Sequence, residues 1–415
     1  MDGVRELERR TPIVMSEGDA FTRGRSLGRA VPARVHRTVE AYLGLCAYHA
    51  GLDRARVLDE AARFIPAIDG LAPALLEEMR GIADGAGCDP REIVAINART
   101  ELLHGAARRP ECTAVAVAPP ASADGHVRIA QNWDWFAALA GTTVLWALRR
   151  DDGPDVLTFT EAGIVGKIGV NAAGLGLCVN LLMSDADHPG PAAPMHVILR
   201  HVLDTARSVD AAVALIAATP RSTSCNHLLA DRAGALADVE AMPHGCRVAR
   251  PAAGTLAHAN HCADDDLVAG DRGARDYPET AARGARGAGC GADARSTDRR
   301  EGGARDPIRP RDRAGVDLPA RGPRPTGRGT GGERRVDHLR PYGGHARPRR
   351  RAAVPVDLPP RRDRRLPAPS AGPATLNGSA GLRLGAIATR AKSFAIRGAV
   401  PGQGRRHLNP RTRRE

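Results

Sequence analysis

Apolar residues recur every three or four positions across much of the first hundred residues. This period places them on one face of an α-helix. Two such stripes lie at 31–48 and 71–86, and each predicts an amphipathic helix. A third helix is expected over 93–103. It is preceded by Asp-Pro-Arg-Glu at 89–92, which supplies a capping aspartate, a proline at the first helical position and a glutamate three residues after the cap.

After residue 112 the pattern changes to short β-branched or alternating runs separated by Gly, Pro and Asp, as is typical of strands. Strands are expected at 113–118, 127–131, 143–148, 156–160, 164–170, 175–180, 228–230, 235–240 and 255–258. Two helices are expected at 195–207 and 209–218. Blocks of helices and strands, rather than alternating βαβ units, predict an α+β layered fold.

The protein-like pattern ends near residue 290. Only 17 of the 125 residues from 291 to 415 are Leu, Ile, Val, Phe or Met, too few to bury a core, and Arg, Pro and Gly dominate. The formal charge is −7 over 1–270 and +20 over 271–415. We expect a helical part at 1–111, a core at 112–285 and a disordered tail at 286–415. GC-rich DNA read out of frame would produce this tail, and a genuine disordered extension is the alternative.

The chain opens without an apolar signal core and contains no long uncharged apolar run, so we expect a cytoplasmic protein without membrane spans. Its eight cysteines form no CxxC pair, which favours reduced thiols over a zinc site or a disulfide framework. His258, His261 and the acidic run 264–266 are of metal-ligand type but match no recognised spacing, so no metal is expected.

Five short segments carry candidate chemistry. They are Asn-x-Arg-Thr-Glu at 97–101, Cys-Thr at 112–113, Gln-Asn-Trp-Asp at 131–134, Glu-Ala-Gly-Ile-x-Gly-Lys-x-Gly at 161–169 and His-x-Asn-His at 258–261. In this order and spacing they resemble the isopenicillin N acyltransferase family of cysteine-dependent N-terminal-nucleophile hydrolases. The resemblance covers residues from about 20 to 270 and then ends.

The resemblance implies an αββα N-terminal-nucleophile hydrolase sandwich, with 1–111 as pro-segment or light chain and 112–285 as the hydrolase core. We expect the sandwich to be incomplete. Family members continue with closing strands and a pocket-lining Ser-x-Cys-Arg segment, and this chain has no such segment. Missing strands would leave sheet edges and an apolar face exposed, which favours aggregation.

The resemblance also assigns roles to individual residues. Cys112 is the nucleophile, exposed when the chain cleaves itself between Glu111 and Cys112. Asp134 orients the new α-amine, and Asn260 donates its amide to the oxyanion. Asn180 is a further candidate for a polar contact with the substrate.

Four further positions bear on this assignment. Trp133 and Trp135 are candidates for a wall of the substrate pocket. Gln131 stands where the related bile salt hydrolases have an arginine, which argues against that subfamily. Glu111 stands where the penicillin enzyme is expected to have glycine, which bears on the efficiency of self-cleavage.

Elementary acid–base chemistry supports an N-terminal cysteine independently. A thiol with a pKa of about 8.5 is mostly protonated at neutral pH and needs a base. The motif places no histidine beside Cys112 in sequence. An α-amine, with a pKa of about 7.7–8.0, would lie next to its own thiol and accept that proton. One residue then supplies both nucleophile and base.

Each of these residues also has a purely structural interpretation. Cys112 would be a small buried hydrophobe at a strand start, Asp134 a turn residue and Asn260 a turn cap, while Trp133 and Trp135 would pack between layers. Lys167, the only lysine before residue 392, is expected in a salt bridge or at a strand edge, with substrate contact as the alternative.

The favoured function is therefore a self-processing amidohydrolase or acyltransferase that acts on linear, non-peptide amides through an acyl-Cys112 thioester. No metal or organic cofactor is expected, and acyl-coenzyme A is a candidate co-substrate. The expected partners are a small-molecule amide or acyl donor and the two cleavage fragments themselves. The alternatives are an inactive truncated relative and a nucleic-acid-binding protein. The basic tail has few aromatic residues to interleave with bases, which argues against the latter.

Overall fold

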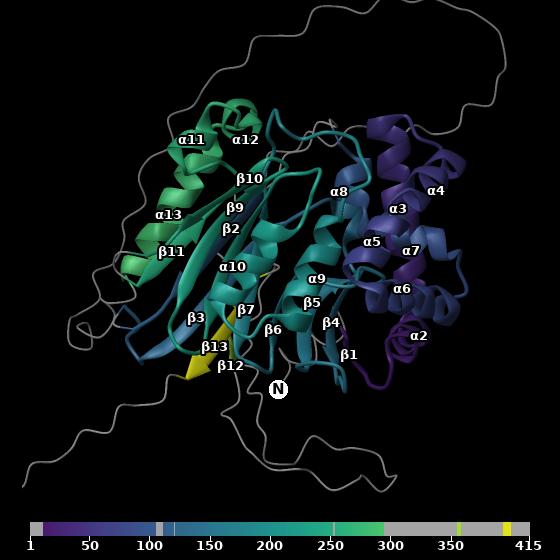
Figure 1. The fold of residues 1–415 in the computed structure, drawn as a ribbon, viewed down its shortest axis with the longest axis horizontal. Helices are drawn as coiled ribbons and strands as arrows, with labels where there is room; N and C mark the ends of the chain where they lie inside the picture. The colour runs from purple at the N-terminus through teal and green to yellow at the C-terminus, as the bar shows by residue number, and fades with distance from the viewer. Residues whose placement is uncertain are drawn as a thin grey trace, which may run out of the picture. The chain divides into compact units, whose positions relative to one another are not determined.

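The computed structural model describes residues 11–104, 111–119, 121–251, 254–293, 355–357 and 393–399 (Figure 1). The first of these ranges is mostly helical, as its periodicity predicts. Its helices are α2 (Ala20–Ala30), α3 (Pro32–Ala50), α4 (Arg54–Ala62), α5 (Ile65–Leu71), α6 (Pro73–Ala86), α7 (Pro90–Asn97) and α8 (Arg99–Leu102). The capping box at the start of α7 is formed by Asp89 and Glu92, as the sequence indicates.

Helices α2 and α6 approach each other closely because glycine lies at their contact. A Cβ added to Gly24 of α2 would lie 1.9 Å from the carbonyl oxygen of Glu78 on α6. A Cβ on Gly81 of α6 would lie 2.1 Å from the carbonyl oxygen of Phe21 on α2. Any side chain larger than hydrogen would therefore push the two helices apart.

The larger sheet has eight strands in the order β1-β4-β5-β6-β7-β8-β9-β10. They are β1 (Ile13–Ser16), β4 (Thr143–Leu148), β5 (Val156–Glu161), β6 (Ile168–Asn171), β7 (Leu175–Leu181), β8 (Cys225–Asp231), β9 (Leu236–Met242) and β10 (Gly245–Ala249). Every neighbouring pair is antiparallel except β1 and β4, which are parallel. The turn between β6 and β7 holds Gly174 at φ 95°, a left-handed conformation that favours glycine.

The smaller sheet has the order β11-β2-β3-β13-β12. Its strands are β2 (Glu111–Val117), β3 (His126–Asp134), β11 (Thr255–His258), β12 (Pro355–Asp357) and β13 (Ser393–Ala399). β2 and β3 pair in antiparallel register with Cys112 opposite Trp133. The first residue of the expected catalytic core therefore lies beside the Gln-Asn-Trp-Asp segment.

The two sheets stack face to face and are covered by helices on their outer sides. β2 and β3 contact β7 and β8 across the interface between the sheets. The helices α9 (Met195–Thr205) and α10 (Val209–Ala218) pack on the larger sheet, and α13 (Glu279–Asp293) packs on β2 and β11 (Figure 1). Two short helices, α11 (Asp265–Val268) and α12 (Arg272–Asp276), precede α13. The expected αββα arrangement is confirmed.

The structure departs from the sequence-based elements at several places. The strand expected from residue 164 begins only at Ile168, and the helix expected over 93–103 is interrupted at Ala98, where φ is −99° and ψ is 17°. The strands β1 and β10 were not predicted. None of the described helices is long and apolar enough to cross a bilayer.

The expected boundary at residue 285 lies inside α13, which continues to Asp293. Two segments of the predicted disordered tail are strands, β12 and β13, and β13 pairs with β3 from Ser393 to Ala399. The edge of β3, for which the sequence predicts no partner strand, is therefore paired with β13. The rest of the tail lies outside the described residues.

Candidate active site

Cys112 lies at the start of β2 with only 4% of its surface exposed. Its backbone N–H donates a 2.7 Å hydrogen bond to Oδ1 of Asn260, which follows β11. The Asn260 amide nitrogen donates in turn to the carbonyl oxygen of Leu181 at the end of β7, at 2.8 Å. One asparagine thus fixes the nitrogen of the expected nucleophile relative to both sheets.

The thiol of Cys112 is protonated in the uncleaved chain. Burial, followed by the negative charge of Asp134, raises its pKa to about 11. The hydrogen bond from Asn260 and the charge of Lys167 act in the opposite direction but do not outweigh burial. The thiol therefore needs a base to react at neutral pH, as the sequence argument requires.

A small pocket opens beside the thiol, between the ends of the two sheets and the start of α9. Its lining residues are Arg99, Cys112, Trp133, Trp135, Lys167, Val179, Leu181 and Met195. The predicted residues Cys112, Trp133 and Trp135 therefore share one cavity. Four of its members, Arg99, Val179, Leu181 and Met195, were not singled out from the sequence, although Arg99 belongs to the Asn-x-Arg-Thr-Glu segment.

The wall of this pocket rests on a buried polar network. The Lys167 ammonium lies 3.7 Å from the centroid of the Trp133 ring and forms an ion pair with Glu161. Glu161 also accepts a 2.7 Å hydrogen bond from the hydroxyl of Tyr42, which itself accepts one from the Trp135 indole. The salt bridge expected of Lys167 is therefore present, and its contact with a substrate stays a prediction.

Asn180 lies apart from this pocket. Its amide nitrogen donates to the carbonyl oxygen of His258 at 3.4 Å, between the two sheets, while its neighbours Val179 and Leu181 line the cavity. Its Oδ1 has no hydrogen-bond partner among the described residues. The substrate contact expected of Asn180 stays a prediction, and in this arrangement its side chain supports the strand that carries Asn260.

The His-x-Asn-His segment is held in place by a charged pair. Nε2 of His258 lies 2.7 Å from Oε1 of Glu240, and its Nδ1–H donates to the carbonyl oxygen of Ala259. Burial opposes the charged imidazolium, but Asp238 and Glu240 outweigh it and raise the pKa of His258 to about 9. A protonated imidazole does not ligate a metal ion. Within the described residues no three His, Cys, Asp or Glu side chains gather as metal ligands.

The first motif joins the helical segment to the sheets. The Asn97 amide nitrogen donates to the carbonyl oxygen of Gly163, and its Oδ1 accepts from the backbone of Val165. The Glu101 carboxylate accepts hydrogen bonds from the backbone N–H of Met195 and the hydroxyl of Thr223, each at 2.9 Å. These contacts fix the glycine-rich block and the start of α9 around the pocket.

Comparison with known proteins finds similarity to acyltransferases. A family described as "Acyl-coenzyme A:6-aminopenicillanic acid acyl-transferase" matches residues 122–284. A curated relative, the 40 kDa form of acyl-coenzyme A:6-aminopenicillanic-acid-acyltransferase from Emericella nidulans, is 31% identical over 192 residues. That alignment covers 46% of this chain and 52% of the relative, so the chain spans about half the length of the curated relative it matches.

Three solved structures match part of this chain. An N-acylethanolamine-hydrolyzing acid amidase ortholog from Caenorhabditis elegans has 14% identity and a TM-score of 0.30 over 36% of this chain and 70% of that one. Penicillin V acylase from Agrobacterium tumefaciens has 20% identity and a TM-score of 0.27 over 34% and 49%. A variant of conjugated bile acid hydrolase from Clostridium perfringens has 18% identity and a TM-score of 0.28 over 37% and 55%.

Proposed function

Because the chain belongs, over residues 122–284, to the acyl-coenzyme A:6-aminopenicillanic acid acyltransferase family, we propose that it is a self-processing cysteine amidohydrolase or acyltransferase. Its substrate class is a linear, non-peptide amide. The observation that carries the proposal is the 2.7 Å hydrogen bond from the Cys112 nitrogen to Asn260, at the mouth of a pocket lined by the same cysteine. After cleavage this nitrogen would be a free α-amine already held by an acceptor.

Self-cleavage would begin with attack of the Cys112 sulfur on the carbonyl carbon of Glu111. The S–C bond forms, the peptide C–N bond breaks, and the thiol proton passes to the departing nitrogen. Water then hydrolyses the thioester, which leaves a carboxylate on Glu111 and returns the proton to the sulfur. The second fragment begins with Cys112, whose amine serves as the base that its buried thiol requires.

Turnover would repeat the same steps on an external amide. The α-amine takes the thiol proton, the sulfur attacks the amide carbon, and the leaving amine departs with that proton. Water or an acceptor amine then releases the acyl group from the Cys112 thioester. No metal or organic cofactor enters this scheme, and in the transfer direction acyl-coenzyme A would serve as acyl donor. Asp134, whose charge reaches the thiol, would orient the α-amine.

The two cleavage fragments would stay associated, because buried polar contacts join them. Arg200 on α9 and Glu78 on α6 are both fully buried and lie 2.6 Å apart. Tyr42 and Asn97 of the first fragment bond to Glu161 and Gly163 of the second. Separating the fragments would expose these groups without partners.

A mass measurement of the purified, full chain tests the proposal. We expect two fragments, 1–111 and 112–415, the second with the N-terminal sequence Cys-Thr-Ala-Val, together with hydrolysis of a chromogenic amide. Cys112→Ala should remain a single chain and be inactive. The matched control is Cys178→Ala, which removes another fully buried cysteine and should still cleave. An intact wild-type chain that nevertheless turns over an amide would refute the N-terminal-nucleophile mechanism.

A further inference from the structure

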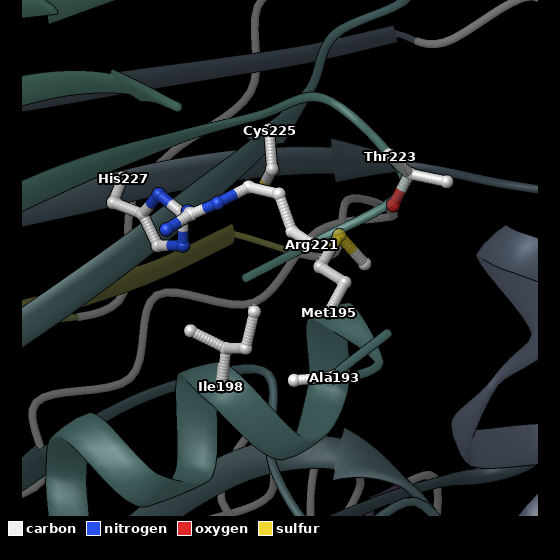
Figure 2. Close-up of a pocket in the computed structure, with 7 residues that line it drawn as sticks. All are labelled: Ala193, Met195, Ile198, Arg221, Thr223, Cys225 and His227. Carbon is white, nitrogen blue, oxygen red and sulfur yellow. The ribbon is translucent and has the colours of Figure 1, made fainter. Parts of the chain in front are cut away.

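A second pocket lies beside the reactive one and has a polar end. Figure 2 shows its lining: Ala193, Met195 and Ile198 from α9 and its approach, and Arg221, Thr223, Cys225 and His227 from the chain that enters and forms β8. In this view the guanidinium of Arg221 lies beside the ring of His227, and the charge of Arg221 acts on that ring. Apolar α9 side chains face this polar pair across the cavity.

Arg221 is a buried cation whose charge is not balanced by an acid. Only 6% of its surface is exposed, and within the described residues no carboxylate pairs with it. Its Nη2 donates to the carbonyl oxygens of Ile216 and Thr219 at the end of α10, whereas Nη1 has no hydrogen-bond partner there. Burial lowers the pKa of the guanidinium. The carbonyl oxygens at the C-terminal end of α10 stabilise part of this charge, and an anion at Nη1 would stabilise it further.

His227 supplies a second polar group at the same place. Its ring is fully buried and close to the Val239 backbone, yet in the described part of the chain neither ring nitrogen makes a hydrogen bond of ordinary geometry. Burial, together with the charge of Arg221, lowers its pKa to about 3, so the ring is neutral and keeps one N–H donor. Two donors therefore lie beside one another without an acceptor.

The polar end of this pocket is one strand away from the nucleophile's pocket. Met195 lines both cavities. Val179 and Leu181, which line the reactive pocket, pair directly with His227 and Cys225 across the β7–β8 ladder. Directly paired residues share a face of the sheet, and neighbouring strands are about 4.8 Å apart. The two cavities therefore share Met195 and adjoin each other across the β7–β8 ladder.

We propose that Arg221 and His227 form a binding site for a carboxylate. The carboxylate accepts from Nη1 of Arg221 and from the His227 ring N–H, and it supplies the charge that the buried guanidinium lacks. Its assignment to the substrate rests on the proposed function: the carboxylate is then carried by the amide that Cys112 attacks, on either its acyl or its amine part. This makes Arg221 a residue that determines specificity, outside the bond-breaking chemistry.

Binding is tested first, without turnover, in the full chain carrying Cys112→Ala. Hexanoate and hexanamide have nearly the same shape and differ in charge, so titration calorimetry should show hexanoate binding at least tenfold more tightly. The preference should disappear in Arg221→Gln and shrink in His227→Leu, with folding checked by circular dichroism. Arg80→Gln, which removes an exposed arginine, is the control and should leave it unchanged. Equal binding of hexanoate and hexanamide to the Cys112→Ala chain that retains Arg221 would overturn the proposal.

Turnover of charged amides then shows whether the carboxylate belongs to the acyl part or to the amine part of the substrate. Glutaryl-4-nitroanilide places it on the acyl part and N-butyryl-4-aminobenzoate on the amine part, with butyryl-4-nitroanilide as the neutral reference. Arg221→Gln should raise KM about tenfold for one of the charged amides and leave the neutral KM unchanged. Cleavage of all three with no dependence on Arg221 would refute the site's role in substrate selection while the proposed function stands. Arg221-dependent hexanoate binding without cleavage of any amide would support the site and refute the proposed function.

Discussion

Glu78 is the centre of a buried ion network that should hold the helical segment to the sandwich. The carboxylate is fully buried on α6 and lies 3.2 Å from Nε of Arg23 and 2.6 Å from Nη1 of Arg200. Arg200 is also fully buried and bonds to Asp204 at 2.7 Å. Glu78→Gln keeps the shape of the side chain but removes the charge that both guanidiniums face. Loss of one member of a buried ion pair costs about 3–5 kcal/mol, because the remaining charge cannot recover its hydration.

The measurement is urea and thermal unfolding in the Cys112→Ala background, where the chain stays in one piece. A loss of about 3–5 kcal/mol corresponds to a fall in Tm of roughly 6–20 °C for a domain of this size. Glu77→Gln is the matched control, since its pair with Arg80 is about half exposed and contributes about 0–1 kcal/mol. If both variants lose the same small amount, the buried network does not stabilise the fold. In the cleaving protein, Glu78→Gln should also let the fragments separate at lower urea concentrations.

Three further predictions follow from individual contacts. Asn260→Ala should slow amide turnover by about 10²–10³-fold in folded protein, and an unchanged rate would remove Asn260 from the site. The raised pKa of His258 contributes stability that is complete below about pH 6.5 and is lost as pH rises through about 9. The urea midpoint of the wild-type chain should therefore fall between these two pH values. In His258→Gln the midpoint should not show this fall. Gly24→Ala should destabilise the chain by at least about 1–3 kcal/mol because its Cβ meets the α6 backbone. Gly44→Ala, with open space around the new Cβ, should stabilise α3 by about 1 kcal/mol. Similar changes in the free energy of unfolding at both positions would contradict the close α2–α6 contact.

Much of the secondary structure follows from local pattern. Thr143–Leu148, Val209–Ala218 and Thr255–His258 have the predicted boundaries because alternation, apolar periodicity and flanking breakers are properties of neighbouring residues. The strand Ile13–Ser16 was missed because it pairs in parallel with a strand about 130 residues away, and four residues hold little periodic signal. The tail strand Ser393–Ala399 was missed for a similar reason, since its pairing with β3 is the feature that defines it.

The sequence predicted some features of the candidate site and could not predict others. The order of five motifs was enough to bring Cys112, Trp133 and Trp135 together, and the structure places them around one pocket. The acceptor that Asn260 offers to the Cys112 nitrogen could not be predicted, because the direction of that side chain depends on Leu181 in the other sheet. The substrate contact expected of Asn180 stays a prediction: its amide nitrogen donates to the carbonyl oxygen of His258, and its neighbours Val179 and Leu181 line the cavity.

The sequence by itself determined the helical and strand segments, the layered class and the identity of the expected nucleophile, since each depends on residue types and short spacings. Only the tertiary structure decided which charges are buried together and which are left unbalanced. Arg200 and Arg221 look alike in the sequence, yet one meets Glu78 and Asp204 while the other meets backbone carbonyls and an uncharged histidine. The physical reason is that burial removes water from a charge, and the partner that replaces water comes from segments that only the folded layers bring together.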